Sequence, residues 1–421
     1  MAASDAPQQI DLDKCVHCGL CLNACPTYRE LGLEMDSPRG RVYQMVQVST
    51  GKAQITESYI EHIDLCLACR GCETACPSGV QYGRLVEAAR ADIENHIQRP
   101  LYVRMFRNFI FGTLLPNPFL LKMAGFGLHL FKASGMQELV RSTKLLPEKL
   151  AAIESLSPPV ERPFFFDQIG KTFPAEGKQR YRVALLAGCI ANVSFARLNE
   201  ATVRVLQKNG CEVVIPEGQG CCGALHLHSG RKADAVKLAR INIDAVLKGN
   251  FDAIITNAAG CGSTLKEYDH LLDNAPSAVE FSKKMKDISE FLASIELNTN
   301  MGSVNATVTY QDSCHLAHGQ KVRVQPRKML AAVPGLKFKE MPMSDLCCGS
   351  AGIYNVVQNE MAMQLLENKM GYVNGSRAEI IATANPGCML QLQAGVKLHG
   401  NGQRVAHVVE ILDEAYRAGK A

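Results

Sequence analysis

The chain has 421 residues, of which 47% are hydrophobic and 20% are charged, and its formal net charge is +4. This length predicts two or three domains. The composition is typical of a folded globular protein and excludes a mainly disordered, collagen-like or polytopic membrane chain. The small net charge, the 6% aromatic content and the absence of Trp argue against a nucleic-acid-binding protein.

The 17 cysteines are the unusual feature of the composition. A disulfide-stabilised secreted protein is short and carries a signal peptide, whereas this chain is long and its first residues are polar. We therefore expect no signal peptide, a reducing cytoplasmic environment and cysteines that bind metal. No uninterrupted apolar run reaches the length of about 18 residues that a membrane span needs, so we expect no transmembrane helix.

Two cysteine runs near the start share the pattern Cys-x2-Cys-x2-Cys-x3-Cys-Pro: the first run is Cys15–Pro26 and the second run is Cys66–Pro77. In two-cluster ferredoxins, three cysteines of one run and the fourth of the other hold each iron–sulfur cube. Zinc is the alternative for thiolate ligands, but the doubled run favours iron–sulfur. We include Pro26 and Pro77 in the binding motif, because proline turns the chain away after the last ligand. The predicted first set is Cys15, Cys18, Cys21 and Cys76, and the second set is Cys66, Cys69, Cys72 and Cys25.

The stretch between the two runs is predicted to contain a helix from Pro38 to Val48. Basic residues lie in or near it, at Arg39, Arg41 and Lys52. We interpret them as a solvated face, with a basic docking surface as the alternative.

The spacing of the cysteines suggests the domain boundaries, because none lies between Cys76 and Cys189. Residues 101–132 are apolar and basic, and we predict helical pieces separated by prolines. We interpret this segment as an internal helical layer; a surface that contacts a bilayer or a partner subunit is the alternative. The predicted domains are a ferredoxin domain over 1–97, a helical connector and Pro-rich linker over 98–178, and two further domains over 179–298 and 304–421.

The second half of the chain contains an internal repeat. Three landmarks (one cysteine, a Cys-Cys-Gly triplet and a further cysteine) recur at offsets of 125, 126 and 127 residues. Strands are predicted near 182–187, 211–216 and 252–257, and again near 306–311, 337–341 and 379–383. Helices are predicted near 194–209, 230–249, 320–333 and 359–374. This alternation indicates parallel α/β units, with the cysteines just after strand ends, where such sheets place their sites.

The repeated cysteines form two further groups of potential ligands. The third set is Cys189, Cys221, Cys222 and Cys261, and the fourth set is Cys314, Cys347, Cys348 and Cys388. Each set could hold one more cluster, or its members could be buried thiols. Gly223 and Gly349 follow the cysteine pairs and are predicted to let the backbone approach a cofactor closely. Cys211 lies at the start of an apolar strand and is predicted to be a core residue.

Histidines accompany these cysteines: His226 and His228 in one copy, and His315 and His318 in the other. We interpret them as satisfied surface residues, with metal ligation or proton donation near a reduced cluster as the alternatives. The spacing of the remaining residues gives no catalytic triad and no carboxylate pair, so we predict no catalytic residue on this chain.

Together, the two runs and the two Cys-Cys-Gly domains resemble the iron–sulfur subunits of bacterial glycolate oxidases, and more broadly the heterodisulfide-reductase-type electron carriers. Segments 36–43, 347–354 and 383–388 look most like the glycolate family. The resemblance implies an α+β multidomain protein: a helical domain with two [4Fe-4S] clusters, then two repeated α/β cysteine-rich (CCG) domains. It also implies that a separate FAD subunit oxidises glycolate to glyoxylate. This chain would pass the electrons singly toward a quinone, at the cytoplasmic face of the inner membrane.

The chain departs from the heterodisulfide-reductase relatives at one motif. Their last motif is Cys-x-x-Cys, which gives five thiolates per site, whereas Cys261 and Cys388 stand alone. We therefore expect a four-thiolate cluster or an empty vestigial site. An electron donor other than glycolate, namely D-lactate or glycerol 3-phosphate, is one alternative. A CCG-type disulfide reductase is another, and the missing cysteine counts against it.

Overall fold

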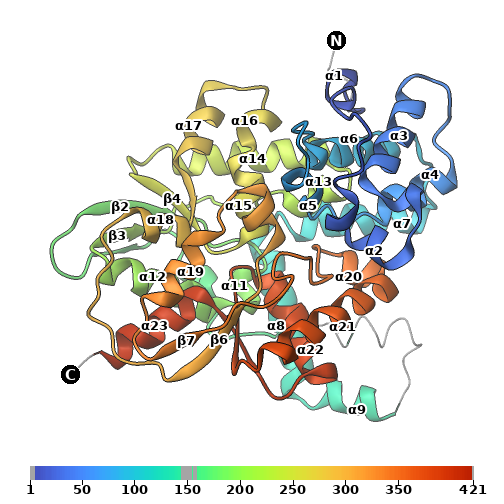
Figure 1. Ribbon diagram of the computed structural model, residues 1–421. Coiled ribbons are helices and arrows are strands. Elements are labelled where there is room, and N and C mark those ends of the chain that lie inside the picture. Colours follow the sequence, from blue (N-terminus) through green and yellow to red (C-terminus); the bar gives the residue numbers. More distant parts are fainter. Residues whose placement is uncertain (1–4, 144–153, 155–158, 420–421) are drawn as a thin grey trace.

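The structure, a computed structural model, describes residues 5–143, 154 and 159–419. A helical N-terminal domain, a helical connector and two α/β units follow one another along the chain (Figure 1). The helical N-terminal domain followed by two repeated α/β units is the predicted fold class.

The N-terminal domain is built of short helices around the two cysteine runs. Its core contains Leu12, Ile63, Leu85 and Val86, all buried. Its elements are α1 (Gln9–Leu12), η1 (Leu22–Ala24), α2 (Pro26–Leu31), η2 (Glu34–Asp36), α3 (Pro38–Ser49), α4 (Glu57–Asp64), α5 (Gly71–Thr74) and α6 (Tyr82–His96). The helix predicted from Pro38 to Val48 is therefore confirmed as α3.

The connector consists of helical pieces, as predicted. They are α7 (Leu101–Arg107), η3 (Asn108–Leu114), α8 (Pro118–Ala133) and α9 (Met136–Ser142). Pro118 starts α8, where a missing N–H costs nothing, and the Asn117 side chain accepts hydrogen bonds from the next backbone amides. No single helix among the described residues is long and apolar enough to cross a bilayer. The segments Leu101–Leu114 and Pro118–Ala133 reach the required length and hydropathy only when they are taken together, and they are bent by 108° to one another.

The first α/β unit has a five-stranded sheet in the order β1-β3-β2-β4-β5. The strands are β1 (Thr172–Phe173), β2 (Tyr181–Leu185), β3 (Cys211–Val214), β4 (Ala253–Thr256) and β5 (Met285–Asp287). The helices are η4 (Phe165–Gln168), α11 (Ala191–Ser194), α12 (Ala196–Lys208), α13 (Ala224–His228), α14 (Lys232–Val246), α15 (Ala259–Lys266), α16 (Tyr268–Leu271), α17 (Pro276–Lys284) and α18 (Ile288–Ser294). β1 pairs antiparallel with β3, so this unit begins before residue 179, where the sequence prediction placed its boundary.

The second unit repeats this sheet without the antiparallel strand. Its order β7-β6-β8-β9 matches β3-β2-β4-β5, and all these neighbours are parallel. The strands are β6 (Ala306–Tyr310), β7 (Leu336–Phe338), β8 (Ile380–Thr383) and β9 (Arg404–His407). The helices are η5 (His315–Gly319), α19 (Val324–Ala331), α20 (Tyr354–Val357), α21 (Asn359–Ser376), α22 (Pro386–His399) and α23 (Val408–Ala418).

The two α/β units share one hydrophobic core. Residues from both sheets and from α12, α18, α19 and α23 belong to the same buried cluster. At the edge of this contact Arg204 holds Asp413 with two hydrogen bonds of 2.9 Å each. The backbone also joins the units, because Ala259 N donates to Ala384 O at 3.2 Å. The loops that follow β4 and β8 therefore face one another.

Candidate metal centres

The two cysteine runs share one backbone conformation. In the first run His17 and Gly19 have φ of 54° and 83°, and in the second run Ala68 and Arg70 have φ of 51° and 64°. These residues flank the second cysteine of each run, Cys18 or Cys69. Left-handed residues alternating with right-handed ones form concave nests of backbone N–H groups, which bind anions and iron–sulfur clusters. The backbone of both runs thus fits a cluster.

The structure brings the last cysteine of each run to the opposite run. Cys15 interacts electrostatically with Cys76 as well as with Cys18. Cys72 interacts likewise with Cys25, in addition to its own-run neighbours Cys69 and Cys66. Burial raises the pKa of the Cys69 and Cys72 thiols well above the usual value. This is the grouping of the first and second sets.

The first and second sets differ in depth. Cys18 is exposed and the other members of the first set are partly exposed, whereas the second set is buried apart from the partly exposed Cys69. Two large apolar side chains within the first run are exposed: Val16 is 68% exposed and Leu20 is 62% exposed. The first set therefore faces the outside and the second set faces the interior.

A buried ion pair supports the second set. Arg41 is fully buried and lies 3.2 Å from the Asp36 carboxylate, to which His62 also approaches at 2.9 Å. Arg41 also donates to the Asp36 carbonyl and to Thr27 Oγ1, and the Cys25 thiol lies 3.7 Å from that carbonyl. Our interpretation of Arg41 as part of a solvated face was wrong: its charge is satisfied inside the domain, beside a predicted cluster ligand.

The third set lies just beyond the ends of the parallel strands β2, β3 and β4. Cys189 Sγ is 3.6 Å from Cys221 Sγ. Cys222 contacts both Cys221 and Cys261 through their side chains. The thiols thus form one chain of contacts, and contact with Cys221 together with burial raises the pKa of Cys189.

The fourth set repeats this arrangement after β6, β7 and β8. The Cys314 side chain contacts Cys347, Cys347 contacts Cys348, and Cys348 contacts Cys388. Contact with Cys348 and burial raise the pKa of Cys388 well above the usual value. The two α/β units therefore repeat a side-chain arrangement as well as a sheet.

One cavity of about 230 Å³ is lined by all members of the third and fourth sets. Leu67 of the second run also lines it, and Cys69 interacts electrostatically with Cys347. The second set thus lies directly behind this cavity. Four thiols per set are the donors that an iron–sulfur cluster takes, so the residues present fit such a group. Within the described residues, no group of three or more His, Cys, Asp or Glu side chains is placed to hold a single metal ion.

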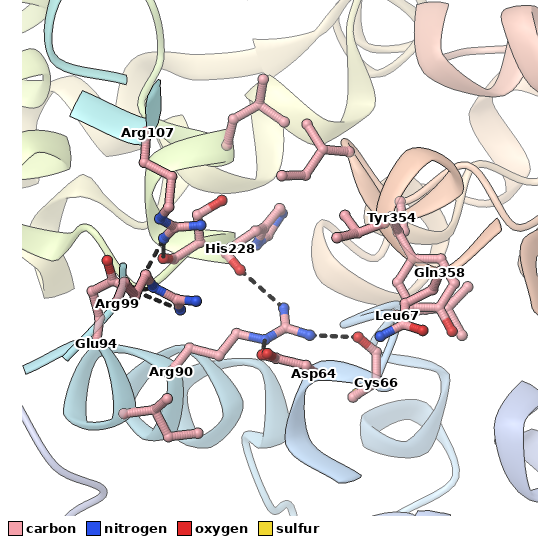
Figure 2. A pocket seen from close by; sticks show the side chains of 16 residues that line it. Asp64, Cys66, Leu67, Arg90, Glu94, Arg99, Arg107, His228, Tyr354 and Gln358 are labelled. Atoms are coloured by element: carbon pink, nitrogen blue, oxygen red, sulfur yellow. Dashed lines mark hydrogen bonds and ion pairs between the residues drawn. The ribbon is translucent and has the colours of Figure 1, made fainter. Parts of the chain in front are cut away.

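A second cavity, of about 170 Å³, lies where α6, the connector and both α/β units meet the second run (Figure 2). Arg90 donates to Cys66 O at 2.5 Å and to His228 O at 3.2 Å. Arg107 of the connector bridges Glu94 and Ser229 O. Arg90 thus joins the backbone of the second run to the first α/β unit, and Arg107 joins α6 to that unit.

The two positions after the cysteine pairs require glycine for a structural reason that the sequence prediction did not give. Gly223 and Gly349 have φ of 84° and 89°. A Cβ on Gly349 would lie 2.5 Å from Ala362 O in α21, and one on Gly223 would lie 3.3 Å from Ala235 Cα in α14. The backbone approaches a helix closely at these positions. This contact holds the preceding thiol pair in place.

The histidines fall into two groups. His226 is fully buried and bonded through Nε2 to Phe111 O, and His318 joins Thr74 to Asp345 O. These contacts are structural, but our interpretation of the two residues as surface histidines was wrong, because both are buried.

His228 and His315 instead line the shared cavity, with ring centroids 5.1 Å apart. His315 Nε2 donates to Ala68 O in the second run at 3.0 Å, and burial lowers the pKa of His315 to about 3. His228 Nδ1 lies 3.1 Å from the Glu87 carboxylate. This histidine pair joins the second run to both α/β units at the edge of the cavity.

Sequence reasoning missed a difference between the two halves of the repeat. Since Gly223 packs on Ala235 and Gly349 on Ala362, α14 and α21 align at an offset of 127 residues. This alignment places Lys369 where the first unit has Asn242. The Asn242 amide bonds the Cys221 carbonyl, whereas Lys369 is 2% exposed and interacts electrostatically with Cys347 and Cys348. Lys369 Nζ donates to Met343 O at 2.5 Å, and burial lowers its pKa to about 8.

Three protein-family models match four segments of the chain. Residues 11–80 match the 4Fe-4S dicluster domain, and residues 183–266 and 308–393 match the cysteine-rich domain. Residues 102–157 match the linker region of the glycolate oxidase iron–sulfur subunit. These matches indicate an iron–sulfur protein.

Relatives match over nearly the whole chain. The chain is 41% identical to the probable glycolate oxidase iron–sulfur subunit of Bacillus subtilis (strain 168), over 96% of this chain and 94% of the relative. It is 34% identical to the glycolate oxidase iron–sulfur subunit of Escherichia coli (strain K12), over the same shares. Lactate utilization protein A of Oceanobacillus iheyensis (strain DSM 14371 / CIP 107618 / JCM 11309 / KCTC 3954 / HTE831) is 30% identical over 57% of this chain and 100% of its own length. The chain belongs to the family of glycolate oxidase iron–sulfur subunits.

Proposed function

We propose that this chain is the electron-transfer subunit of a glycolate-oxidising complex. A partner subunit that carries FAD oxidises glycolate to glyoxylate, and this chain conducts the electrons to a quinone-type acceptor. The observation that carries the proposal is the succession of thiol sets, from the exposed Cys18 through the buried second set to the cavity of the third and fourth sets.

In this proposal the first set (Cys15, Cys18, Cys21 and Cys76) and the second set (Cys66, Cys69, Cys72 and Cys25) each hold a [4Fe-4S] cluster. The third and fourth sets each hold one further four-thiolate cluster. A bound cluster accepts and releases one electron at a time. The chain's own residues set the order of the sites, shield the inner sites from water and supply the thiolates.

The flavin-containing partner is proposed to dock over the first set. Val16 and Leu20 lie within the first run on either side of Cys18, and all three residues are exposed. An apolar surface around a partly exposed redox site brings the donor close to the site while excluding water from the contact. Electrons then enter where the sites are shallowest.

D-lactate is the second candidate donor substrate, because lactate utilization protein A is 30% identical over 57% of the chain. Cells that lack this chain distinguish the donors. In their membranes and extract, dye or quinone reduction is measured with glycolate, D-lactate and glycerol 3-phosphate. We expect selective loss of glycolate oxidation, restored by the wild-type chain but not by a Cys72→Ser variant. Unchanged glycolate oxidation would exclude the proposal, and the donor whose oxidation is lost would replace glycolate.

Iron analysis tests how many sets are occupied. We expect about sixteen irons per anaerobically purified chain, in four cubes. About eight irons would mean that the clusters are confined to the N-terminal domain. A matched Cys211→Ser variant is the control, because Cys211 is buried at the start of β3, away from the four sets, and should keep the iron content of the wild type.

A further inference from the structure

The outer faces of α7 and α8 are apolar. On α7 and the start of η3, Leu101, Tyr102, Met105, Phe106 and Phe109 are exposed, with Phe106 67% exposed. These positions recur at the spacing of one helix face. The residues form the α7 stripe, and the sequence interpretation of this segment as an internal layer was wrong for these side chains.

On α8 the exposed apolar residues fall at every third or fourth position. They are Phe119, Met123, Phe126 and Leu130, the α8 stripe, and Phe119 is 68% exposed. The opposite face of α8 is apolar as well and packs on the protein: Leu121 and Gly125 are buried, and a Cβ on Gly125 would meet Val193 at 2.7 Å. A helix that is apolar on both faces belongs in a protein core or in lipid.

The charged residues within α7 and α8 are all basic. Between Arg99 and Gln137 the sequence contains no Asp and no Glu, but it contains Arg104, Arg107, Lys122 and Lys132. Arg104 is exposed on α7 itself, and Lys122 is half-exposed and paired with Asp167 at 2.6 Å. Exposed apolar side chains on helices whose own charged residues are all basic suit a surface of anionic lipid. The combined hydropathy of Leu101–Leu114 and Pro118–Ala133 also favours contact with lipid.

We propose that the α7 and α8 stripes form a lipid-binding surface, which inserts into one leaflet of a bilayer that contains anionic lipid. A bend of 108° between the two helical segments excludes a straight crossing and leaves them to lie in the interface. The apolar surface around Cys18 is a different part of the chain, so the flavin-containing partner already has a separate docking site under the proposed function. The stripes place the chain at the membrane, where a lipid-soluble acceptor is found.

Vesicle flotation with the purified full chain, clusters intact, tests this proposal. The vesicles contain phosphatidylcholine alone, or phosphatidylcholine with about one third phosphatidylglycerol. We expect binding to the anionic vesicles, weakened by salt, and little binding to the neutral ones. The double variants Phe106→Ser/Phe109→Ser and Phe119→Ser/Met123→Ser should each lower the partition coefficient at least about tenfold, because they remove inserted apolar side chains.

The matched control is Val357→Ser/Leu398→Ser, which removes apolar residues that are 66% and 60% exposed outside the stripes. It should bind vesicles like the wild type. Absence of vesicle binding by the wild type, or equal binding by the stripe variants, would overturn the proposal. So would stripe variants that keep vesicle binding but no longer copurify with the flavin-containing partner, since that result makes the stripes a protein interface. Glycolate-dependent cluster reduction in detergent solution is measured on the same variants, so that failure of the proposed function is recognised separately.

Discussion

The side chain of Lys369 makes the fourth thiol set electrostatically different from the third. It is buried beside Cys347 and Cys348, whereas the neutral Asn242 occupies the corresponding place in the first unit. A nearby positive charge favours the reduced, more negative form of a cluster, and this effect is strong where water is excluded. The fourth site should therefore have the higher reduction potential of the two.

A Lys369→Met variant tests this difference. We expect a lower midpoint potential for the fourth site, with the other sites unchanged, in a redox titration followed by electron paramagnetic resonance. Lys397→Met, which removes an exposed lysine from the helix that carries Cys388, is the control and should leave all midpoints in place. An unchanged midpoint in the Lys369 variant, at unchanged iron content, would show that the lysine does not tune the site.

The buried ion pair of Arg41 with Asp36 contributes to the folding stability of the N-terminal domain. Replacing Arg41 by Met leaves Asp36 buried without its guanidinium partner, which costs about 3–5 kcal/mol of folding free energy. Urea unfolding followed by circular dichroism should show this loss. Arg29→Met removes an exposed arginine from α2 and should change the unfolding free energy little. Equal stability of the two variants would rule out a structural role for the buried pair.

At the scale of elements, the sequence predicted the strands that precede the cysteine loops, including the edge strand β7, but not β1, β5 and β9 at the other sheet edges. β2, β4, β6 and β8 are short apolar runs, and each lies within or close to its predicted range. β5 and β9 read Met-Lys-Asp and Arg-Val-Ala-His, which give no apolar run, and they form because a neighbouring strand offers an open edge.

Burial of Arg41 could not be predicted either, because it depends on how η2 and α4 bring Asp36 and His62 together.

Gly349 connects the fourth set to α21. A Gly349→Ala variant would have a strained backbone and a contact with Ala362 O, so we expect a loss of about 1–3 kcal/mol in stability and of iron from the fourth site. Gly371 lies on an exposed part of the same helix with open space around it, and Gly371→Ala should stabilise by about 0.5–1 kcal/mol. Thermal unfolding and iron analysis measure both effects. Equal iron content and melting temperature in the two variants would contradict this role.

The start of α18 should make stability depend on pH. Asp287 caps this helix by accepting from Ser289 N, and burial raises its pKa to about 7. In the unfolded chain its pKa is about 3.9, so between pH 4 and 7 the folded state binds more protons and loses stability as the pH rises. Asp287→Asn removes this dependence. Relative to the wild type, the variant should gain about 1 kcal/mol between pH 6 and 8.5.

Melting temperatures of both proteins at these two pH values provide the measurement. Asp244→Asn, which changes an exposed carboxylate on α14, serves as the control and should show no such gain. A constant difference between wild type and Asp287→Asn would mean that Asp287 is ionised in the folded protein throughout this range.

At the scale of the whole molecule, the eight thiols of the third and fourth sets share one cavity. The sequence predicted each set separately, from the repeat. It could not predict that the sets face one another, because cysteine spacing says nothing about the relative orientation of two sheets. That orientation comes from the shared core of the two units and from the contact between the loops after β4 and β8.

The same arrangement orders the thiol sets from the surface of the molecule to its interior. The first set lies at the surface and the second set lies behind it. Leu67 of the second run lines the shared cavity, so this run reaches the cavity wall. The connector helices lie beside the first α/β unit and present their apolar stripes to the outside. The proposed path inward from a docked donor and the proposed lipid-binding surface thus belong to different parts of one chain.

The central claim is that electrons from glycolate pass through the clusters of this chain. The most direct test adds glycolate, without air, to the purified complex of this chain with its flavin-containing partner, and follows the visible absorbance and paramagnetic signals of the clusters. We predict that glycolate reduces the clusters of the wild type, and that Cys72→Ser interrupts reduction beyond the first site. Reduction of the flavin with every cluster left oxidised would contradict the account.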